Sequence, residues 1–407
     1  MRVLLVSDQA SPGGGAEVMT RVLRDALRRR GHDARVFATH LRFPGAESFA
    51  DYTCFGTTSR LRTLLQSFNP WAFLSLRRVL AEFRPDVVHV RIFLTQLSPT
   101  ILPLLRDRPS LYSAVWPRAV CPLGTKVLPD GSRCRERAGL PCYRHGCLPI
   151  RDWFPLMLQR RLWNAWRGAL DLIVANSEAC RGQLLEDGVS PVEVVWNGVP
   201  VVPARPPLSG PPEAAFAGRL VRQKGADVLL RAFAQVATEI PTARLLVAGD
   251  GPEWKSLERQ AEALGISSRV AMLGLLSSAD LERRLAGAWV QVVPSRWTES
   301  FGLVAAEAMM RGTAVVASNL GGLPEYIKDG ETGHLVPSGD DRALAKALVR
   351  ILRDRDLAEQ IGGAARRFAL AELSDEVCAG RFLERYERLL NRHGEAGASG
   401  APVGGQP

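Results

Sequence analysis

Short apolar runs alternate with amphipathic segments along most of the chain. Residues 3–6 are such a run, and residues 16–30 then repeat apolar positions at helical spacing until Gly31. Residues 35–38 are the next apolar run. A strand, a helix and a second strand in this order form a parallel unit, so the pattern predicts a parallel sheet. Further strands are expected at 87–90, 111–115, 172–174, 214–217, 245–248, 270–273, 290–293 and 314–317.

The alternation of strands and helices stops once and then begins again. Residues 200–213 contain six prolines and no apolar periodicity, which is typical of a stiff linker. The pattern therefore predicts an α/β chain with two Rossmann-like, doubly wound domains that face each other across a cleft. The expected parts are an N-terminal domain (1–199) with a Cys-rich insertion (117–150), the linker (200–213), a C-terminal domain (214–374), a C-terminal helix (375–392) and a disordered tail (393–407).

The composition narrows the class of protein. With 407 residues, of which 46% are hydrophobic and 23% charged, the chain is typical of soluble globular proteins. It has no uninterrupted apolar stretch of about 18 residues, the length of a membrane-spanning helix. The first apolar run is too short for a signal peptide, so we expect a cytoplasmic protein.

The net charge of +10 lies entirely in the N-terminal half. Residues 1–203 hold 27 Lys and Arg against 17 Asp and Glu, whereas residues 204–407 hold 25 of each. An anionic partner would explain this excess, and so would a general preference for Arg, which outnumbers Lys by 47 to 5. The excess is spread over many helices and forms no basic stripe, so we do not expect nucleic-acid binding.

Residues 151–167 alternate Trp, Phe, Leu and Met with Arg. This pattern fits a helix that lies on an anionic membrane surface, at the inner face for a cytoplasmic protein. It also fits a helix that packs its aromatic side chains into the domain with Arg outward. Both interpretations remain open.

Four of the seven cysteines fall in the insertion. Cys121, Cys134, Cys142 and Cys147 have the spacing C-x12-C-x7-C-x4-C, with His145 nearby. They could hold a structural Zn²⁺ that stabilises the insertion, or they could be unliganded reduced thiols of a cytoplasmic protein.

Candidate chemistry follows the predicted strands of both domains. Gly13, Gly14 and Gly15 precede the first helix, where they would either form a tight turn or bring backbone N–H groups to an anion. Arg219 and Lys224 follow the first strand of the second domain, and two cations in one loop can converge on a diphosphate.

Two carboxylates flank the start of a later helix. Glu299 precedes the predicted helix 304–310 and Glu307 lies within it, while Gly302 and Leu303 offer N–H groups at its N-terminus. A carboxylate inside this helix could accept hydrogen bonds from both hydroxyls of a ribose.

Taken together, these motifs resemble the GT-B glycosyltransferases, and among them the retaining group called family 4. The matching motifs are Gly13–Glu17, Asn197–Val199, Gly218–Arg219 with Lys224–Gly225, Gly249–Pro252, the E-x7-E pair Glu299 and Glu307, Gly321–Glu325, and Asp329–Gly330 with Thr332–Gly333.

The resemblance implies roles for these residues. Arg219 and Lys224 would hold the diphosphate of a nucleotide-sugar donor, Gly302 and Leu303 would bind phosphate, and Glu307 would bind ribose. Glu299 would be catalytic beside the sugar. Gly249, Gly251 and Phe301 would complete the donor site, and the loop of Gly13, Gly14, Gly15 and Glu17 would close over phosphates and acceptor.

In this family the transfer retains the anomeric configuration and usually needs no metal. The D-x-D string Asp354–Asp356 falls in a helical segment far from any strand end, where a solvated face is expected. The family commonly has a histidine after a middle strand of the first domain, and residues 111–117 contain none. His89, in the predicted strand 87–90, is the nearest candidate, as a catalytic or a structural residue.

The expected function is retaining transfer of a sugar to a glycan or lipid-linked acceptor. The alternatives are a nucleotide-sugar 2-epimerase-like enzyme and a degenerate nucleotide-sugar-binding protein, and product analysis distinguishes them. A phosphorylase would need a pyridoxal phosphate bound to a lysine, which no motif indicates.

Overall fold

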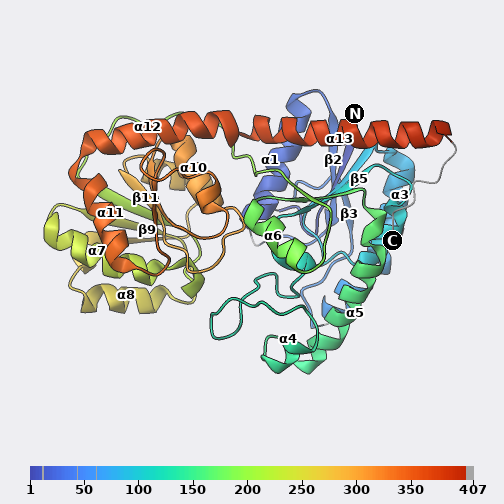
Figure 1. Cartoon of the computed structure of the whole chain (residues 1–407), viewed down its shortest axis with the longest axis horizontal. Helices are drawn as coiled ribbons and strands as arrows, with labels where there is room; N and C mark the ends of the chain where they lie inside the picture. Colours follow the sequence, from blue (N-terminus) through green and yellow to red (C-terminus); the bar gives the residue numbers. More distant parts are fainter. Residues whose placement is uncertain (12, 44, 61, 400–407) are drawn as a thin grey trace. The chain divides into compact units, whose positions relative to one another are not determined.

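The computed structural model describes the chain apart from residues 12, 44, 61 and 400–407 and the side chains of residues 396–399. Two compact units are present: unit 1 comprises residues 1–198 with the chain from residue 375 onward, and unit 2 comprises residues 199–374. Each unit is a sheet flanked by helices (Figure 1). The predicted α/β class with two Rossmann-like sheets is confirmed.

Unit 1 contains a seven-stranded parallel sheet with the strand order β3-β2-β1-β4-β5-β6-β7. The order reverses between β1 and β4, which pair with each other, and this is the point where doubly wound sheets bind ligands. The strands are β1 (Arg2–Val6), β2 (Asp33–Thr39), β3 (Tyr52–Cys54), β4 (Val87–Val90), β5 (Ser110–Ala114), β6 (Leu172–Ala175) and β7 (Val192–Val194).

Helix α3 of unit 1 (Pro70–Phe83) begins at a side-chain cap. Pro70 occupies the first turn of α3, and the Asn69 side chain accepts a hydrogen bond from the Ala72 N–H at 3.0 Å. The helices are α1 (Gly15–Arg29), α2 (Arg62–Ser67), α3 (Pro70–Phe83), α4 (Leu140–Arg144), α5 (Ile150–Trp166), α6 (Glu178–Glu186) and α13 (Asp375–Ser399).

Helix α13 packs on unit 1, although it follows unit 2 in the sequence. Its side chains Phe382, Tyr386 and Leu389 are buried in the same core cluster as residues of α1, β1 and β2. The C-terminal helix is therefore part of the first domain and not a separate element.

The prediction of a disordered tail is wrong for residues 393–399, because these residues continue α13 as far as Ser399. The imidazole of His393 lies 3.1 Å from the Asp171 carboxylate and ties this part of the helix to unit 1. The Gly- and Ala-rich composition suggested disorder, but no proline interrupts the helix in this stretch. Residues 400–407 of the expected tail lie outside the described residues.

Unit 2 repeats the same topology in a six-stranded parallel sheet with the order β10-β9-β8-β11-β12-β13. Its order reverses between β8 and β11. The strands are β8 (Glu213–Ala217), β9 (Arg244–Ala248), β10 (Val270–Gly274), β11 (Val290–Val293), β12 (Ala314–Ser318) and β13 (His334–Val336). The helices are α7 (Ala226–Glu239), α8 (Trp254–Ala263), α9 (Ser278–Leu285), α10 (Leu303–Arg311), α11 (Asp341–Arg353) and α12 (Arg355–Glu372).

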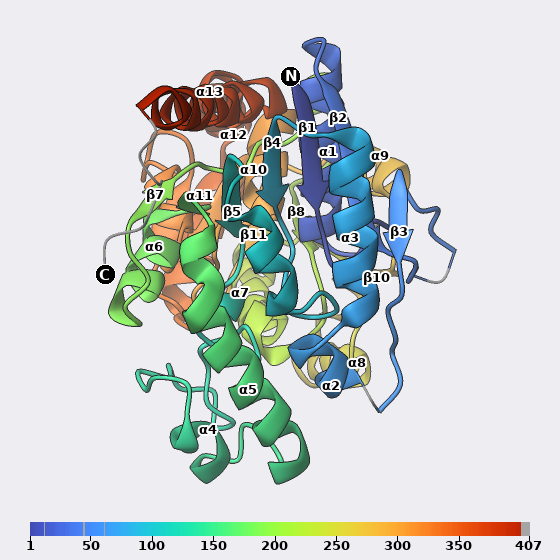
Figure 2. The ribbon, with the colours of Figure 1, turned by 90° about the vertical axis from the view of Figure 1, so that its right-hand side faces the viewer.

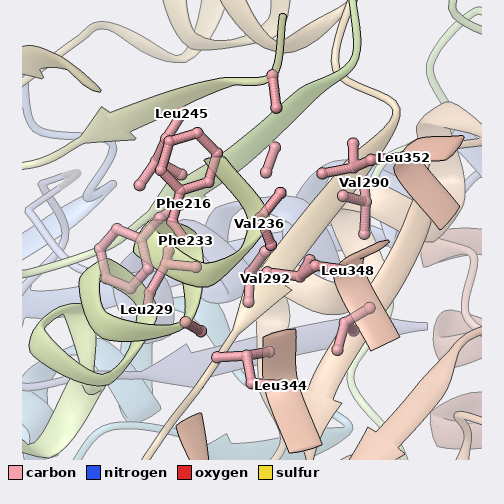
Figure 3. Close-up of a cluster of buried hydrophobic side chains, with 14 of the residues drawn as sticks. Phe216, Leu229, Phe233, Val236, Leu245, Val290, Val292, Leu344, Leu348 and Leu352 are labelled. Carbon is pink, nitrogen blue, oxygen red and sulfur yellow. The ribbon is translucent and has the colours of Figure 1, made fainter. Parts of the chain in front are cut away.

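The core of unit 2 joins the sheet to α7 and α11. Phe233 of α7 and Leu348 of α11 are fully buried with Val290 of the central strand β11 (Figure 3). This packing holds β8 and β11 side by side and so fixes the strand ends that carry the candidate site.

The expected linker, residues 200–213, packs against unit 2. The Arg205 guanidinium lies 2.8 Å from the Glu359 carboxylate, and Leu208 is buried in the unit 2 core. The six prolines stiffen the segment, and these contacts attach this connection between the two units to unit 2.

The expected insertion, residues 117–150, contains only α4 and short turns as regular structure. A buried ion pair anchors it, since the Lys126 ammonium lies 2.7 Å from the Asp187 carboxylate. Helix α4 lies beside α5 (Figure 2). In the part of the chain that the structure describes, no helix has the length and apolarity to cross a membrane.

Candidate functional site

The candidate site of unit 2 lies at the carboxyl ends of β8 and β11, where the strand order reverses. The loop after β8 carries Arg219 and Lys224, and the loop after β11 carries Ser295 and Glu299. Because the two strands are paired neighbours, these loops leave the same edge of the sheet.

Lys224 and Glu299 form an ion pair across the two loops. The Lys224 ammonium donates to the Glu299 carboxylate at 2.6 Å, and the Ser295 hydroxyl donates to the same carboxylate oxygen at 2.5 Å. Glu299 is buried, whereas Lys224 is partly accessible and lies 6.0 Å from the centre of the Trp297 ring. The pair places a fixed carboxylate beside a cation that solvent can reach.

The backbone around Glu299 is fixed by the segment after β12. The Gly322 N–H donates to the Glu299 carbonyl at 2.9 Å. A Cβ at Gly321, whose φ is +69°, would lie 2.3 Å from that carbonyl oxygen. The glycine therefore permits the close approach that positions Glu299.

The N-terminus of α10 follows directly. Gly302 precedes the helix with a φ of +89°, and the Tyr326 hydroxyl donates to the carbonyls of Phe301 and Gly302 at 3.0 and 2.8 Å. No described residue accepts a hydrogen bond from the N–H groups of Leu303 or Val304. Such free donors at a helix N-terminus suit an anion.

Glu307 projects from the second turn of α10. Burial raises the pKa of its carboxyl to about 7, partly offset by the nearby Arg311 guanidinium. Within the described chain no group donates a hydrogen bond to this carboxylate, so it is free to accept hydrogen bonds from hydroxyl groups of a ligand.

The two glycines after β9 are required for packing between loops. Gly249 has a φ of +137°, and a Cβ there would lie 1.9 Å from the Gly218 carbonyl oxygen. A Cβ at Gly251 would lie 2.4 Å from the Leu220 carbonyl oxygen. These contacts shape the loop of Arg219, which is exposed and has no ion pair among the described residues. The structure thus joins Lys224 to Glu299, and it shows no contact between Arg219 and this pair.

In unit 1 the glycine-rich turn lies between β1 and α1. The Phe43 ring covers Gly13, where a Cβ would lie 1.9 Å from a ring carbon. Gly14 precedes α1 and Gly15 begins it. Glu17 bends back to its own backbone N–H, and burial raises the pKa of its carboxyl. The phosphate-binding and the tight-turn interpretations of this loop both stay predictions.

Of the two interpretations of His89, its surroundings favour the structural one. His89 is fully buried, its Nδ1 lies 2.6 Å from the Tyr386 hydroxyl, and its Nε2 lies 2.7 Å from the Ser113 hydroxyl. Burial holds the pKa of this imidazole well below its ordinary value. With both ring nitrogens occupied inside the core, His89 is the structural histidine that connects β4, β5 and α13.

For the four cysteines of the insertion, the structural zinc site and the unliganded thiols both stay predictions. All four are free thiols, and in the described residues no three His, Cys, Asp or Glu side chains are placed to hold a metal ion. Cys134 approaches the Glu136 carbonyl at 3.8 Å. Burial raises the pKa of the Cys142 and Cys147 thiols, and the neighbouring thiols raise it further. The thiols of the insertion therefore lie close enough to influence one another's ionisation.

Sequence reasoning missed three residues that the structure connects to these sites. Ser295 and Trp297 contact the Glu299–Lys224 pair from the loop after β11. Asp8, directly after β1, is buried and accepts hydrogen bonds from the N–H groups of residues 95–97. Their position after buried strands was the available signal. The D-x-D string is structural, because Asp354 caps α12 through the Leu357 N–H at 3.0 Å.

Comparison with known families agrees with this arrangement. The glycosyl transferases group 1 family matches residues 188–368, which include all of the unit 2 site. The glycosyltransferase family 4 pattern matches residues 13–114 of unit 1.

Curated relatives match about half of the chain. A phosphatidyl-myo-inositol mannosyltransferase of Mycobacterium leprae is 36% identical over 224 residues, which are 53% of this chain and 59% of the relative. A D-inositol 3-phosphate glycosyltransferase of a Nocardioides species is 36% identical over 249 residues, 54% of each chain. These alignments thus cover little more than half the length of either relative.

Solved structures match nearly the whole chain. Sucrose-phosphate synthase from Thermosynechococcus elongatus has a TM-score of 0.70 and 23% identity, covering 96% of this chain and 100% of its own. Anabaena HepE, solved with UDP-glucose, has a TM-score of 0.68 and 20% identity, covering 95% and 100%. These likenesses establish the GT-B fold. The two family matches, over residues 13–114 and 188–368, show that the chain belongs to the glycosyl transferases group 1 family of glycosyltransferases.

Proposed function

We propose that this protein is a retaining glycosyltransferase that moves a sugar from a nucleotide-diphosphate sugar to a glycan or lipid-linked acceptor. The observation that carries the proposal is the arrangement after β8 and β11: a solvent-accessible cation, a buried carboxylate and a helix N-terminus. HepE was solved with UDP-glucose, which supports a nucleotide-sugar donor for this chain.

Each group of the site suits one part of such a donor. The Lys224 ammonium and the N–H groups of Leu303 and Val304 can neutralise the diphosphate, which becomes the leaving group when the glycosidic bond breaks. Glu307, without a hydrogen-bond donor in the described chain, can accept from both ribose hydroxyls. Arg219, exposed at the loop tip, can reach the diphosphate from outside. Fixed cations provide the charge that a divalent metal would otherwise supply.

In this proposal Glu299 acts on the sugar rather than on the nucleotide. Ser295 and Gly321 fix its carboxylate and backbone, and Lys224 connects it to the diphosphate position. A preorganised carboxylate beside the bond that breaks stabilises positive charge that develops on the sugar ring.

The donor is tested by thermal shift with UDP-, GDP- and ADP-sugars. A ligand that binds only the folded state stabilises it by about 2.7 kcal/mol at 100 times its Kd. One nucleotide should shift the melting temperature far more than the others. No shift with any of them would reject the proposed donor site.

A second candidate, a nucleotide-sugar-binding protein without transfer activity, is favoured by one observation. His89 is confined to the core, and residues 111–117 supply no other histidine. Product analysis with the donor identified above separates the candidates. Transfer or slow hydrolysis of the donor supports an enzyme, and binding without turnover supports the binding protein.

The acceptor side is proposed from a surface of unit 1. We define the α5 face as the exposed stripe Ile150, Arg151, Phe154, Leu158 and Arg161, in which Phe154 is 66% exposed and Ile150 and Leu158 are each 50% exposed. Leu64 and Phe68, at or just after the neighbouring helix α2, are also exposed. Apolar side chains flanked by arginines match an anionic lipid surface.

The rest of α5 is tied to the domain. Trp163 is buried, the Arg160 guanidinium donates to the Ala119 carbonyl at 2.7 Å, and that of Arg167 donates to the Gly188 carbonyl at 2.8 Å. The helix therefore combines both interpretations of its sequence, with one packed face and one exposed face. We propose that the exposed face meets the inner membrane from the cytoplasm and brings a lipid-linked acceptor to the enzyme.

A further inference from the structure

A small pocket in unit 1 contains a buried cation without a counter-ion. Arg91 follows β4 directly and is 3% exposed. It lines the pocket with residues of α1, with Asn197 and Gly198, and with Asp375 and Cys378 of α13. The pocket lies at the reversal point of the unit 1 strand order, apart from the insertion and the α5 face.

The guanidinium of Arg91 has no ion pair and no hydrogen bond with any residue that the structure describes. Its Nε is buried and has no hydrogen-bond partner among the described residues, and its guanidinium lies 5.7 Å from the centre of the Phe382 ring. Two other arginines with buried side chains have a carboxylate partner. Arg311 pairs with Glu282 at 2.8 Å, and Arg205 pairs with Glu359 at 2.8 Å.

Among the described residues, no group around Arg91 supplies an unpaired negative charge. The pKa of the Cys378 thiol and that of the Tyr386 hydroxyl are both raised by burial, so both stay neutral. His89 is also neutral. The Asp375 carboxylate is engaged by the Arg29 guanidinium at 2.5 Å. Asn197 is buried too, and no described residue bonds to its side-chain amide.

We propose that this pocket binds one small monovalent anion of the size of chloride. A buried charge is stable only when it is paired or hydrogen-bonded, and one anion would pair with Arg91 and accept a hydrogen bond from Asn197. The pocket has room for one particle of about the size of a water molecule. Chloride and bromide meet this size, whereas sulfate, phosphate and gluconate exceed it.

The test is the line width of ³⁵Cl NMR in dilute chloride, with gluconate holding the ionic strength constant. Bound chloride in fast exchange broadens the signal. We expect excess broadening with the wild-type protein. Bromide should remove this broadening by displacing the bound chloride, and sulfate should not. We expect Arg91→Met to lose the broadening and Asn197→Ala to weaken chloride binding several-fold.

The matched control is Arg78→Met, which removes the same charge from an exposed side chain paired with Glu82. It should leave the broadening unchanged. Excess broadening that persists in Arg91→Met, or that is absent from the wild type, would overturn the site. Displacement by sulfate as effective as that by bromide would overturn the assigned ligand size.

A second readout does not depend on NMR. For wild type, each tenfold rise in chloride above its Kd should lower the unfolding equilibrium constant of unit 1 about tenfold, because chloride binds only the folded state. Arg91→Met should show no such dependence and should be more stable than wild type in gluconate alone, because it buries no unpaired charge. Equal chloride dependence in both proteins would contradict the proposal.

Discussion

The Lys224 ammonium lies 2.6 Å from the Glu299 carboxylate, across a separation of 75 residues in the chain. The two residues come from loops after adjacent strands, so the sheet, not local sequence, brings them together. In this pair the lysine is the more accessible partner and the glutamate the more buried. A diphosphate that approaches from solvent therefore meets the lysine first.

Replacing Lys224 with Ala should weaken donor binding by about 1.5–3 kcal/mol, the scale of a hydrogen bond to a charged group. Arg219→Ala should have an effect in the same direction, because its exposed guanidinium can reach the diphosphate. Calorimetry with the preferred nucleotide diphosphate measures both. Lys255→Ala, an exposed lysine on α8, is the control and should bind as wild type does. Unchanged affinity in both site variants would remove these residues from the donor site.

Glu299→Gln should lower kcat while the donor Kd stays nearly constant. The substitution keeps the size of the side chain and its hydrogen bond with Ser295, but it removes the charge beside the sugar. Loss of an interaction that acts mainly in the transition state lowers turnover more than binding. Steady-state rates and calorimetry on the same samples check this. If affinity falls by the same factor as turnover, Glu299 is a binding residue.

Glu307 makes donor binding depend on pH. Its carboxyl has a pKa raised to about 7 by burial. The ionised form accepts stronger hydrogen bonds from the two ribose hydroxyls than the protonated form does, because both of its oxygens are charged acceptors. Affinity for the donor should therefore rise with pH up to about 7 and then level off, with proton release on binding below pH 7. Glu307→Gln should abolish this dependence.

A nucleotide sugar is the right probe for this experiment. The terminal phosphate of a free nucleoside diphosphate has a second pKa near about 6 and would add its own titration. The stability of the fold has the opposite pH dependence and falls as pH rises, because the folded state binds the Glu307 proton more tightly than the unfolded state does. The contribution of this proton to the free energy of unfolding is complete below the ordinary carboxyl pKa of 4.5 and is lost as pH rises to about 7. A flat binding profile in the wild type would contradict the role of Glu307.

Periodicity predicted the central strands of both sheets, because buried parallel strands are continuous apolar runs. It missed the edge strands β3, β7 and β13, which have three residues each and too few positions to show a pattern. The Glu299 and Glu307 motif was visible because one loop and one helix contain it. The contact of Ser295 with Glu299 is also local, but no spacing rule marks it.

The role of His89 could not be predicted from the sequence, because it depends on a contact with a residue far away in the chain. A histidine in a strand of the first domain was compatible with catalysis until its partner Tyr386 was known, and 297 residues separate the two. The same applies to α13, whose apolar stripe was evident but whose attachment to unit 1 depends on tertiary packing.

The α5 face gives the last prediction. Flotation with vesicles should show that the protein binds when anionic lipid is present and not when all lipid is zwitterionic. Each arginine near such a surface contributes about 1 kcal/mol, so Arg151→Gln with Arg161→Gln should reduce partitioning by roughly 30-fold. Phe154→Ser with Leu158→Ser should reduce it as well, through lost apolar contact with lipid.

High salt and a matched control variant distinguish vesicle binding through the α5 face from binding through the overall net charge of the protein. Screening shortens from about 8 Å at physiological salt to about 3 Å at 1 M, so high salt should release the wild type and affect the arginine double variant much less. Lys255→Gln with Arg259→Gln removes two exposed charges from α8 of unit 2 and should float as wild type does. Arg160 and Arg167 are left intact, because their bonds to backbone carbonyls stabilise unit 1. If the wild type fails to float with anionic vesicles at low salt, the exposed side chains of α5 do not bind a membrane surface. A soluble acceptor then becomes the better assignment.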